Sequence, residues 1–460
     1  MGNEVSGEVR DLIEAALKGH EADYVELRLE EGEATRLIYR GRELEDLGRT
    51  TFRGGNVRAM VKGGWGFTTF NQVEDLRARV ALAVRQAHLV GREESLLAQV
   101  EPVVDVVEPY LVKDPASVPL SRKKEMLDSY NDIIMGTPGV QTSQVIYRDL
   151  RRRVTFATNE GAYIEQGKVD VAARFTAIAR KDGDVQQASL STGRLGDFSF
   201  LEGLREEIQD VARRAVNLLT AASVRAGEYP VVLEPILAGV FAHEAFGHLS
   251  EADHIYENER LRELMALGRR FGGAHLNITD GAAPPGLRGS YKYDDEGVPA
   301  SKTYLVREGV LVGRLHSRET AAKMAEQPTG NARAINYRHE PIVRMTNTSI
   351  EPGQATLEDL LSGIKEGVYA KDWYGGTTSM EMFTFSSGEA CMIRAGRLAE
   401  PLRGVVLTGN LFTTLQNVDA IGNDLRWSEG GGCGKGGQSP LPVSSGSPHI
   451  RISRCVVGGR

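Results

Sequence analysis

The chain has 460 residues, more than a typical single hydrophobic core contains, so we expect two domains. Its apolar fraction of 41% and charged fraction of 25% are ordinary for a soluble globular protein. The formal net charge of −7 at pH 7, with no basic stripe, argues against direct binding of nucleic acid.

The first residues, "MGNEVSGEVRDLIEAALKGH", predict an amphipathic helix over 6–18 and contain no apolar signal core. No stretch approaches the roughly 20 apolar residues that span a bilayer, so we expect no membrane contact. Three cysteines, an odd number, do not suggest a disulfide framework. These features together predict a reducing, cytoplasmic location.

The first half of the chain predicts an α+β domain. Alternating polar and apolar residues over 24–47 predict two strands joined by a turn at "EEGEA". Apolar residues at helical spacing predict a helix over 74–90. Residues 103–121 are expected to form a connector, in which Ser121 caps a helix that continues to about residue 136.

Residues 144–183 predict a β-meander with turns at "NEG" and "KDG", and a further helix is predicted over about 202–222. We place the domain boundary near residue 225. The prediction is an N-terminal α+β domain, 1–225, and a C-terminal domain, 226–460.

The C-terminal domain begins with a short apolar strand, "YPVVLEP", that leads into a helix. Beyond that helix the sequence is rich in strand patterns and in glycine. This composition predicts a curled, barrel-like antiparallel sheet with the helix packed against it.

That helix contains the motif "AHEAFGHLSEADH", residues 242–254, in which His243 and His248 are five residues apart. On a regular α-helix, side chains five apart diverge by about 140°, too far to share one metal ion. A π-bulge would bring both histidines onto one face, and Gly247 would permit local unwinding. A shared metal therefore requires an irregular helix.

Two unrelated histidines on one helix are the alternative interpretation, although a chance H-E-x-x-x-H is expected on the order of once in a hundred such chains. A catalytic zinc site uses three protein ligands. The candidates for the third ligand are Cys433, His254, Asp253, Glu251, His339 and His449.

Cys433 is the strongest of these candidates, because its glycine-rich setting, "SEGGGCGKGGQSP", contains no residues that form a core. Flanking glycines let a backbone approach an ion, and the nearby Lys435 would favour the thiolate. Cys391 and Cys455 lie in strand patterns, where a buried, inert cysteine is the expected state. The acids of "YDDEGVPA" do not have EF-hand spacing, and the glycine-rich segment lacks the P-loop order.

Several motifs together resemble the TldD/PmbA family, specifically the TldD-type metallopeptidases. The matching stretches are "HEAFGHLSEAD" (243–253), "GSYKYDDEGVPA" (289–300), "NARAINYRHEPIVRMTNTSIEPG" (331–353), "SGEACMIRAGRL" (387–398) and "GGGCGKGGQSPLPV" (430–443). The resemblance spans the second half of the chain and, more loosely, the first.

The resemblance implies Zn²⁺ held by His243, His248 and Cys433, with Glu244 as the catalytic glutamate. It also implies a two-domain fold and proteolysis of peptides or unfolded proteins. The family resemblance further implies that two subunits pair around an enclosed chamber. The partner would be a second copy of this chain or a PmbA (TldE)-type subunit, which lacks the metal motif.

Glu244 is suited to take a proton from water at the open zinc position and to deliver it to the departing amine. Residues eligible to stabilise the oxyanion are His254, Tyr293, Arg333 and His339. The alternative function is a non-catalytic assembly or regulatory subunit whose zinc stabilises the fold, as in the family's older description as a modulator of DNA gyrase. Glu244 favours catalysis, because a structural zinc site needs no base.

Overall fold

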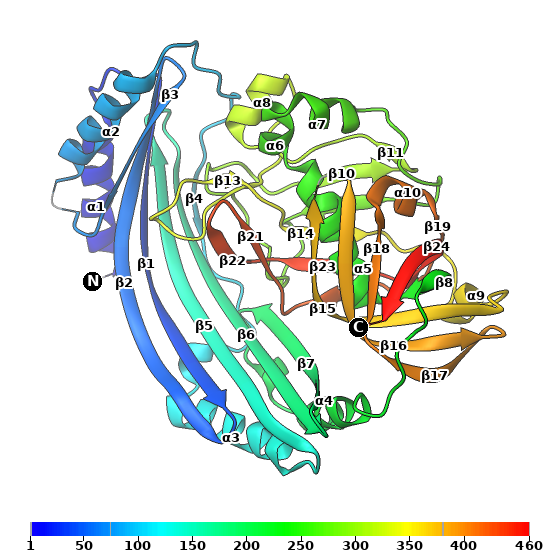
Figure 1. Ribbon diagram of the computed structural model, residues 1–460. Helices are drawn as coiled ribbons and strands as arrows, with labels where there is room; N and C mark the ends of the chain where they lie inside the picture. Colours follow the sequence, from blue (N-terminus) through cyan, green and yellow to red (C-terminus); the bar gives the residue numbers. More distant parts are fainter. Residues whose placement is uncertain (1, 74, 380, 460) are drawn as a thin grey trace.

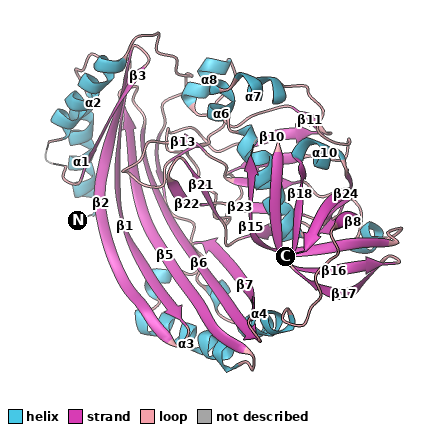
Figure 2. Ribbon diagram, in the orientation of Figure 1, coloured by secondary structure: helices cyan, strands magenta, loops and turns pink. Residues whose placement is uncertain are grey.

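The computed structural model describes residues 2–73, 75–379 and 381–459. A long, curved sheet forms one side of the molecule, and the C-terminal half of the chain lies against its concave face (Figure 1). Helices cover the convex face of that sheet, whereas strands dominate the C-terminal half (Figure 2). The mixed α+β architecture predicted from the sequence is confirmed.

The curved sheet has the strand order β3-β2-β1-β5-β6-β4, and β7 also pairs with β6. Its pairings are antiparallel except for that of β4 with β6. The strands are β1 (Tyr24–Arg40), β2 (Glu43–Val61), β3 (Gly64–Phe70), β4 (Val104–Val107), β5 (Val140–Thr158), β6 (Tyr163–Lys181) and β7 (Asp184–Leu195). The helices of this half are α1 (Gly2–Leu17), α2 (Leu76–Val90), α3 (Leu120–Gly136) and α4 (Arg205–Asn217).

The two faces of this sheet differ in chemistry because side chains alternate along each strand. On the convex face Leu27 packs with α1 and α2, and Tyr147 packs with α3 and α4, all in two apolar clusters. Burying each such side chain contributes roughly 1.5–3 kcal/mol. The concave face is instead polar and charged.

Ion pairs across the concave face join the two halves of the chain. Arg58 lies 2.7 Å from Glu296, and Arg28 lies 2.9 Å from Asp295. Both acids belong to the "YDDEGVPA" turn, so these carboxylates hold the turn against the sheet.

The C-terminal half contains a barrel. Strand β15 pairs with both β8 and β16, which closes the series β15-β8-β24-β18-β16. The strands of this sheet are β8 (Gly227–Leu233), β15 (Glu366–Ser379), β16 (Met382–Arg394), β17 (Arg397–Arg403), β18 (Val405–Asn410), β19 (Val418–Ile421) and β24 (Ile450–Gly459). The predicted barrel-like domain is confirmed.

A second sheet has the order β11-β10-β9-β14-β23-β20, and two small hairpins complete the strands described. Their bounds are β9 (Ile278–Gly281), β10 (Lys302–Arg307), β11 (Val310–Leu311), β12 (Ala332–Arg333), β13 (Ile342–Val343), β14 (Asn347–Ile350), β20 (Arg426–Ser428), β21 (Gly432–Lys435), β22 (Gln438–Pro442) and β23 (Ser444–Ser447). The helices are α5 (Pro235–Ala242), α6 (Ala252–Glu257), α7 (Glu259–Leu264), α8 (Arg318–Met324), α9 (Leu357–Leu361) and α10 (Leu411–Gln416).

Helix α5 contacts both β15 of the barrel and β14 and β23 of the second sheet. Its buried Phe241 packs edge-on against Phe383 and Phe385, with ring centroids 5.6 and 5.9 Å apart. Such aromatic pairs add about 0.5–1.5 kcal/mol beyond their buried area. This packing places the end of α5, and hence the histidine motif, against the barrel.

Three local predictions are wrong. The "EEGEA" segment is the middle of β1, and the hairpin turns at residues 41–42 instead. Gly32 is needed there because a Cβ atom would clash with the backbone carbonyl oxygen of Arg151 and would lie 2.6 Å from the Phe52 ring. The expected connector contains strand β4, which pairs with β6. Val104 and Val106 of this strand are exposed, so its sequence lacks the pattern of a strand with one buried apolar face. Helix α3 begins before Ser121, which is not its cap.

Strands up to β7 and strands from β8 onward belong to separate sheets in the part of the chain that the structure describes. We keep residue 225, in the segment between α4 and β8, as the proposed domain boundary. Within the same described residues, no helix is both long and apolar enough to cross a membrane.

Candidate metal centre

The helix irregularity that the histidine spacing requires is present. Helix α5 ends at Ala242, and residues His243–Gly247 form a π-helical turn (η3) that is followed by a 3-10 turn, His248–Ser250 (η4). The backbone N–H of His248 donates to the carbonyl oxygen of His243, five residues earlier. The wider turn puts the two imidazoles on one side, with ring centroids 5.2 Å apart. The predicted π-bulge is therefore confirmed.

Gly247 serves a different purpose from the one expected. Its backbone is helical, with φ −58° and ψ −50°, so the chain does not unwind there. A Cβ atom at this position would instead lie far inside van der Waals contact with Sδ of Met345, which is fully buried. Gly247 thus permits close packing of the π-helical turn against the segment that contains Met345.

Gly247→Ala is expected to destabilise the protein by about 1–3 kcal/mol, because the added methyl group forces Met345 out of a filled space. Chemical denaturation followed by circular dichroism measures this loss. Gly136→Ala is the matched control, because a Cβ there meets no atom within 4 Å. Equal stability of the two variants would contradict the packing role of Gly247.

Cys433 comes to the two histidines from the β21–β22 hairpin. Its Sγ lies 3.4 Å from Nε2 of His248, and one candidate ligand atom from each of the three residues lies within 4.8 Å of the others. In the described part of the chain, Nδ1 of His243 is buried without a hydrogen-bond partner. Two imidazoles and one thiol are ligands that Zn²⁺ prefers. The three residues therefore fit a zinc ion by their chemistry and their proximity.

The charges at this cluster also suit a metal ion. Burial opposes ionisation of the Cys433 thiol, but contacts with His243 and His248 lower its pKa to about 5. Burial also opposes the charged form of His248 and so lowers its pKa. Hydrogen bonds to Cys433 and Glu251 outweigh this effect and raise the pKa of His248 to about 10. These contacts favour the ionised thiol, the form in which cysteine would bind a metal ion.

Two buried residues orient the cluster from outside. The Glu251 carboxylate accepts a hydrogen bond from Nδ1 of His248 at 3.0 Å, and its pKa is about 2 because the opposing effect of burial is outweighed by His248 and Lys435. The guanidinium of Arg344, which is fully buried, donates to the carbonyl oxygen of Cys433 at 2.7 Å. Such outer contacts fix the orientation of metal-binding side chains.

Lys435 does not have the role that its position in the sequence suggested. Its ammonium donates to Asp253 at 2.7 Å and lies 3.1 Å from Glu251, so it is paired with carboxylates. The low pKa of the Cys433 thiol results from the two histidines instead. Lys435 thereby holds Glu251 and Asp253 beside the hairpin.

The other residues considered from the sequence are engaged elsewhere. Of the candidate ligands, His254 is exposed, Asp253 pairs with Lys435, His339 contacts Asn336, and His449 contacts Asp424 and Tyr369. Of the residues eligible to stabilise the oxyanion, Tyr293 donates its hydroxyl hydrogen to Asp105, and Arg333 donates to the carbonyl oxygens of Met345 and Pro442. Cys391 and Cys455 lie in β16 and β24, and burial raises the pKa of both thiols.

Glu244 follows His243 directly and remains partly exposed. Among the described residues its carboxylate has no hydrogen-bond or ion-pair partner. A carboxylate that is unpaired and accessible beside a candidate metal site is free to accept a proton.

The sequence presents Glu251 only as a candidate third ligand, and it does not identify Arg344 as part of the site. The spacing of Glu251, three residues after His248, is the signal that could have identified its contact with that histidine. Nothing in the sequence around Arg344 distinguishes it, because its contact with Cys433 spans 89 residues.

Comparisons with known proteins agree with these features. Three domain descriptions of the PmbA/TldA metallopeptidases match the chain: domain 1 over 25–88, the central domain over 113–222 and the C-terminal domain over 226–459. A Synechocystis protein named as a metalloprotease is 51% identical, and the match covers 95% of each chain. A Saccharolobus solfataricus protein named as a zinc metalloprotease TldD homolog is 29% identical, over 88% of this chain and 90% of that protein.

Solved structures share the fold. A Thermotoga maritima protein described as a modulator of a DNA gyrase superposes with a TM-score of 0.81 at 19% identity, over 98% of this chain and 100% of that one. TldE from Thermococcus kodakarensis superposes with a TM-score of 0.73 at 17% identity, over 99% and 100% of the two chains. With three matching domains and a close relative over nearly its whole length, the chain belongs to the PmbA/TldD family of metallopeptidases.

Proposed function

We propose that this chain is a zinc-dependent peptidase that hydrolyses peptide bonds in extended peptides or unfolded proteins. The observation that carries the proposal is the convergence of His243, His248 and Cys433, with Glu244 next to His243 in the chain, partly exposed and unpaired among the described residues. Three protein ligands are typical of catalytic zinc sites, whereas structural sites usually close with four. The name of the Saccharolobus relative supports zinc as the metal.

Bound zinc would act as a Lewis acid that polarises the scissile carbonyl group and favours ionisation of water. Glu244 accepts a proton from the attacking water on a carboxylate oxygen, as the water oxygen bonds to the carbonyl carbon. When the C–N bond breaks, Glu244 delivers that proton to the departing amine nitrogen. Glu251 holds the imidazole of His248 through Nδ1, which leaves Nε2 directed toward Cys433.

Glu244 also separates this function from the alternative, a regulatory subunit with structural zinc. A structural site requires no base, and an unpaired carboxylate near the metal would add nothing to its stability. We further propose that the chain acts in the cytoplasm and pairs with a second copy or with a TldE-type subunit.

Removal and replacement of the metal test the peptidase proposal. Treatment with a chelator is expected to abolish cleavage of an unstructured fluorogenic peptide, and one equivalent of Zn²⁺ per chain should restore it. Metal analysis alongside the assay relates activity to zinc content. Full activity in protein shown to be metal-free would contradict the proposal.

A further inference from the structure

A cavity of about 660 Å³ lies between the concave face of the N-terminal sheet and the β21–β22 hairpin. Gly430, Gly431 and Gly432, which immediately precede Cys433, form part of its wall. Leu441, which pairs with Cys433 across the hairpin, lines it as well. Some residues of the cavity wall are therefore next to the candidate ligand Cys433 in the sequence or in the hairpin. None of the three candidate ligands lines the cavity itself.

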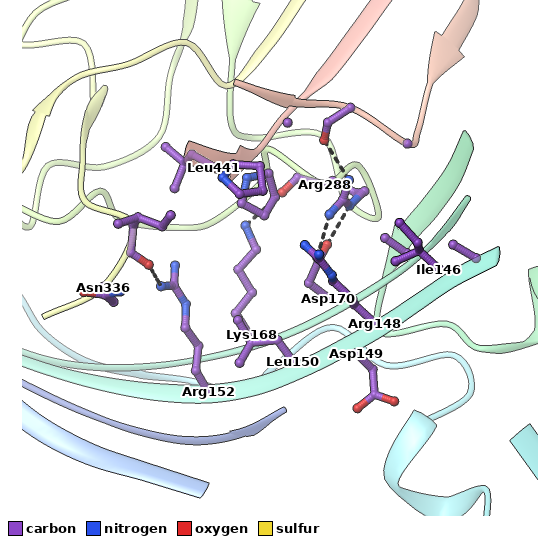
Figure 3. A pocket seen from close by; sticks show the side chains of 18 of the residues that line it. Ile146, Arg148, Asp149, Leu150, Arg152, Lys168, Asp170, Arg288, Asn336 and Leu441 are labelled. Carbon is purple, nitrogen blue, oxygen red and sulfur yellow. Dashed lines mark hydrogen bonds and ion pairs between the residues drawn. The ribbon is translucent and has the colours of Figure 1, made fainter. Parts of the chain in front are cut away.

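Four basic side chains line the sheet side of this cavity. Arg148 and Arg152 come from β5, and Lys168 and Arg174 come from β6. Arg152 and Lys168 are direct cross-strand partners, so two basic side chains are adjacent there. Figure 3 shows the Lys168 side chain extending from the sheet toward Leu441.

The acids of the lining neutralise these cations only in part: Arg152 lies 3.7 Å from Glu30, whereas Arg148, Lys168 and Arg174 have no ion-pair partner among the described residues. Each acid has a basic partner: Glu30 with Arg28, Asp170 with Arg288 and Asp149 with Lys123. The carboxylate of Asp149 points away from the cavity (Figure 3). The pairing of Asp170 with Arg288 is bidentate, with both distances 2.7 Å, which leaves little capacity for a further cation.

Arg148 and Arg174 are exposed to the cavity and, among the described residues, have no hydrogen-bond or ion-pair partner. The Lys168 ammonium donates to the carbonyl oxygen of Arg288 at 2.9 Å, a neutral acceptor. Burial of this ammonium, with Arg333 and Arg152 nearby, lowers the pKa of Lys168 well below its usual value. The repulsion among these groups would be relieved by an anion in the cavity.

We propose that this cavity binds carboxylate groups of the peptide substrate, so that the enzyme prefers peptides with an acidic group near the cleaved bond. The inference rests on the proposed peptidase function. Carboxylates are the anions that peptides carry, as Asp and Glu side chains or as a C-terminus. Arginine guanidinium groups match the planar geometry of a carboxylate. Because Gly432 lines the cavity and Cys433 is a candidate ligand, a peptide at the metal centre would reach these cations.

Binding and cleavage of matched peptides test the inference separately. The peptides are labelled and unstructured, and they differ only in Glu against Gln or in a free against an amidated C-terminus. Fluorescence anisotropy with Glu244→Gln protein measures affinity without turnover. We expect the acidic peptides to bind about tenfold more tightly at low salt, with the preference reduced at high salt. The two pairs of peptides distinguish the side-chain carboxylate from the terminal one.

The double variant Arg148→Gln/Arg174→Gln should lose this preference, and it breaks no contact among the described residues, where neither arginine has a partner. The matched control is Arg180→Gln/Arg205→Gln, which removes the same charge from two exposed arginines that lie outside the cavity lining and have no partner within the described part of the chain. The control should keep the preference.

Equal affinity for acidic and neutral peptides, or a preference that survives in Arg148→Gln/Arg174→Gln, would overturn the inference. So would binding of inorganic phosphate without any preference among the peptides. If wild-type protein with zinc cleaves none of the peptides, the peptidase proposal fails, while the anisotropy data still decide the carboxylate site. Cleavage with no difference in binding would reject the carboxylate site alone.

Discussion

Glu244→Gln is expected to lower kcat for peptide cleavage by about 10²–10⁴-fold, the usual contribution of a general base. The amide keeps the size of the side chain but cannot accept the proton of the attacking water. Because Glu244 has no partner among the described residues, its replacement breaks no internal contact. Steady-state kinetics with a fluorogenic peptide measure the loss.

Zinc content is the control for this experiment. Glu244 is outside the group of three candidate ligands, so Glu244→Gln should retain the zinc content of the wild type. Cleavage at the wild-type rate would reject Glu244 as the base. Loss of zinc together with activity would show instead that Glu244 is needed to hold the metal.

Cys433→Ser is expected to weaken zinc binding by more than the roughly 10–100-fold that loss of an outer hydrogen bond costs. The variant removes one of three candidate ligands. The Cys433 thiol ionises readily, since contacts with His243 and His248 outweigh its burial and bring its pKa to about 5, whereas a serine hydroxyl stays protonated. Competition with a chromophoric chelator measures the change in affinity.

Cys391→Ser and Cys455→Ser are the matched controls. Both cysteines lie in barrel strands, outside the candidate ligand cluster, and burial raises the pKa of their thiols. Their zinc affinity should remain that of the wild type. A loss in either control equal to that in Cys433→Ser would contradict the assignment of the thiol ligand.

The metal centre could be predicted because its requirements are geometric. Two histidines five residues apart cannot share an ion on a regular helix, so the spacing itself predicts the π-helical turn at His243–Gly247. Cys433 stood out because no apolar residues surround it in the sequence. The role of Gly247 could not be predicted, since it depends on Met345, almost 100 residues away.

The wrong predictions about the fold also result from contacts between residues that are distant in the sequence. The "EEGEA" segment resembles a turn in composition, but Gly32 is required there by the close approach of the Arg151 carbonyl oxygen and the Phe52 ring on the two neighbouring strands. The basic lining of the cavity, formed by Arg148, Arg152, Lys168 and Arg174, could not be predicted from the sequence either. Its residues are spread over β5 and β6, and only the strand register brings them together. The net charge of the whole chain does not reveal such a local excess of positive charge.

X-ray absorption at the zinc edge of the zinc-loaded protein tests the proposed metal centre most directly. Coordination by His243, His248 and Cys433 predicts one sulfur at about 2.3 Å and two imidazole nitrogens at about 2.0–2.1 Å. The sulfur signal should disappear in Cys433→Ser and persist in Cys391→Ser. A spectrum of the wild type without sulfur, or a sulfur signal that survives in Cys433→Ser, would contradict this account.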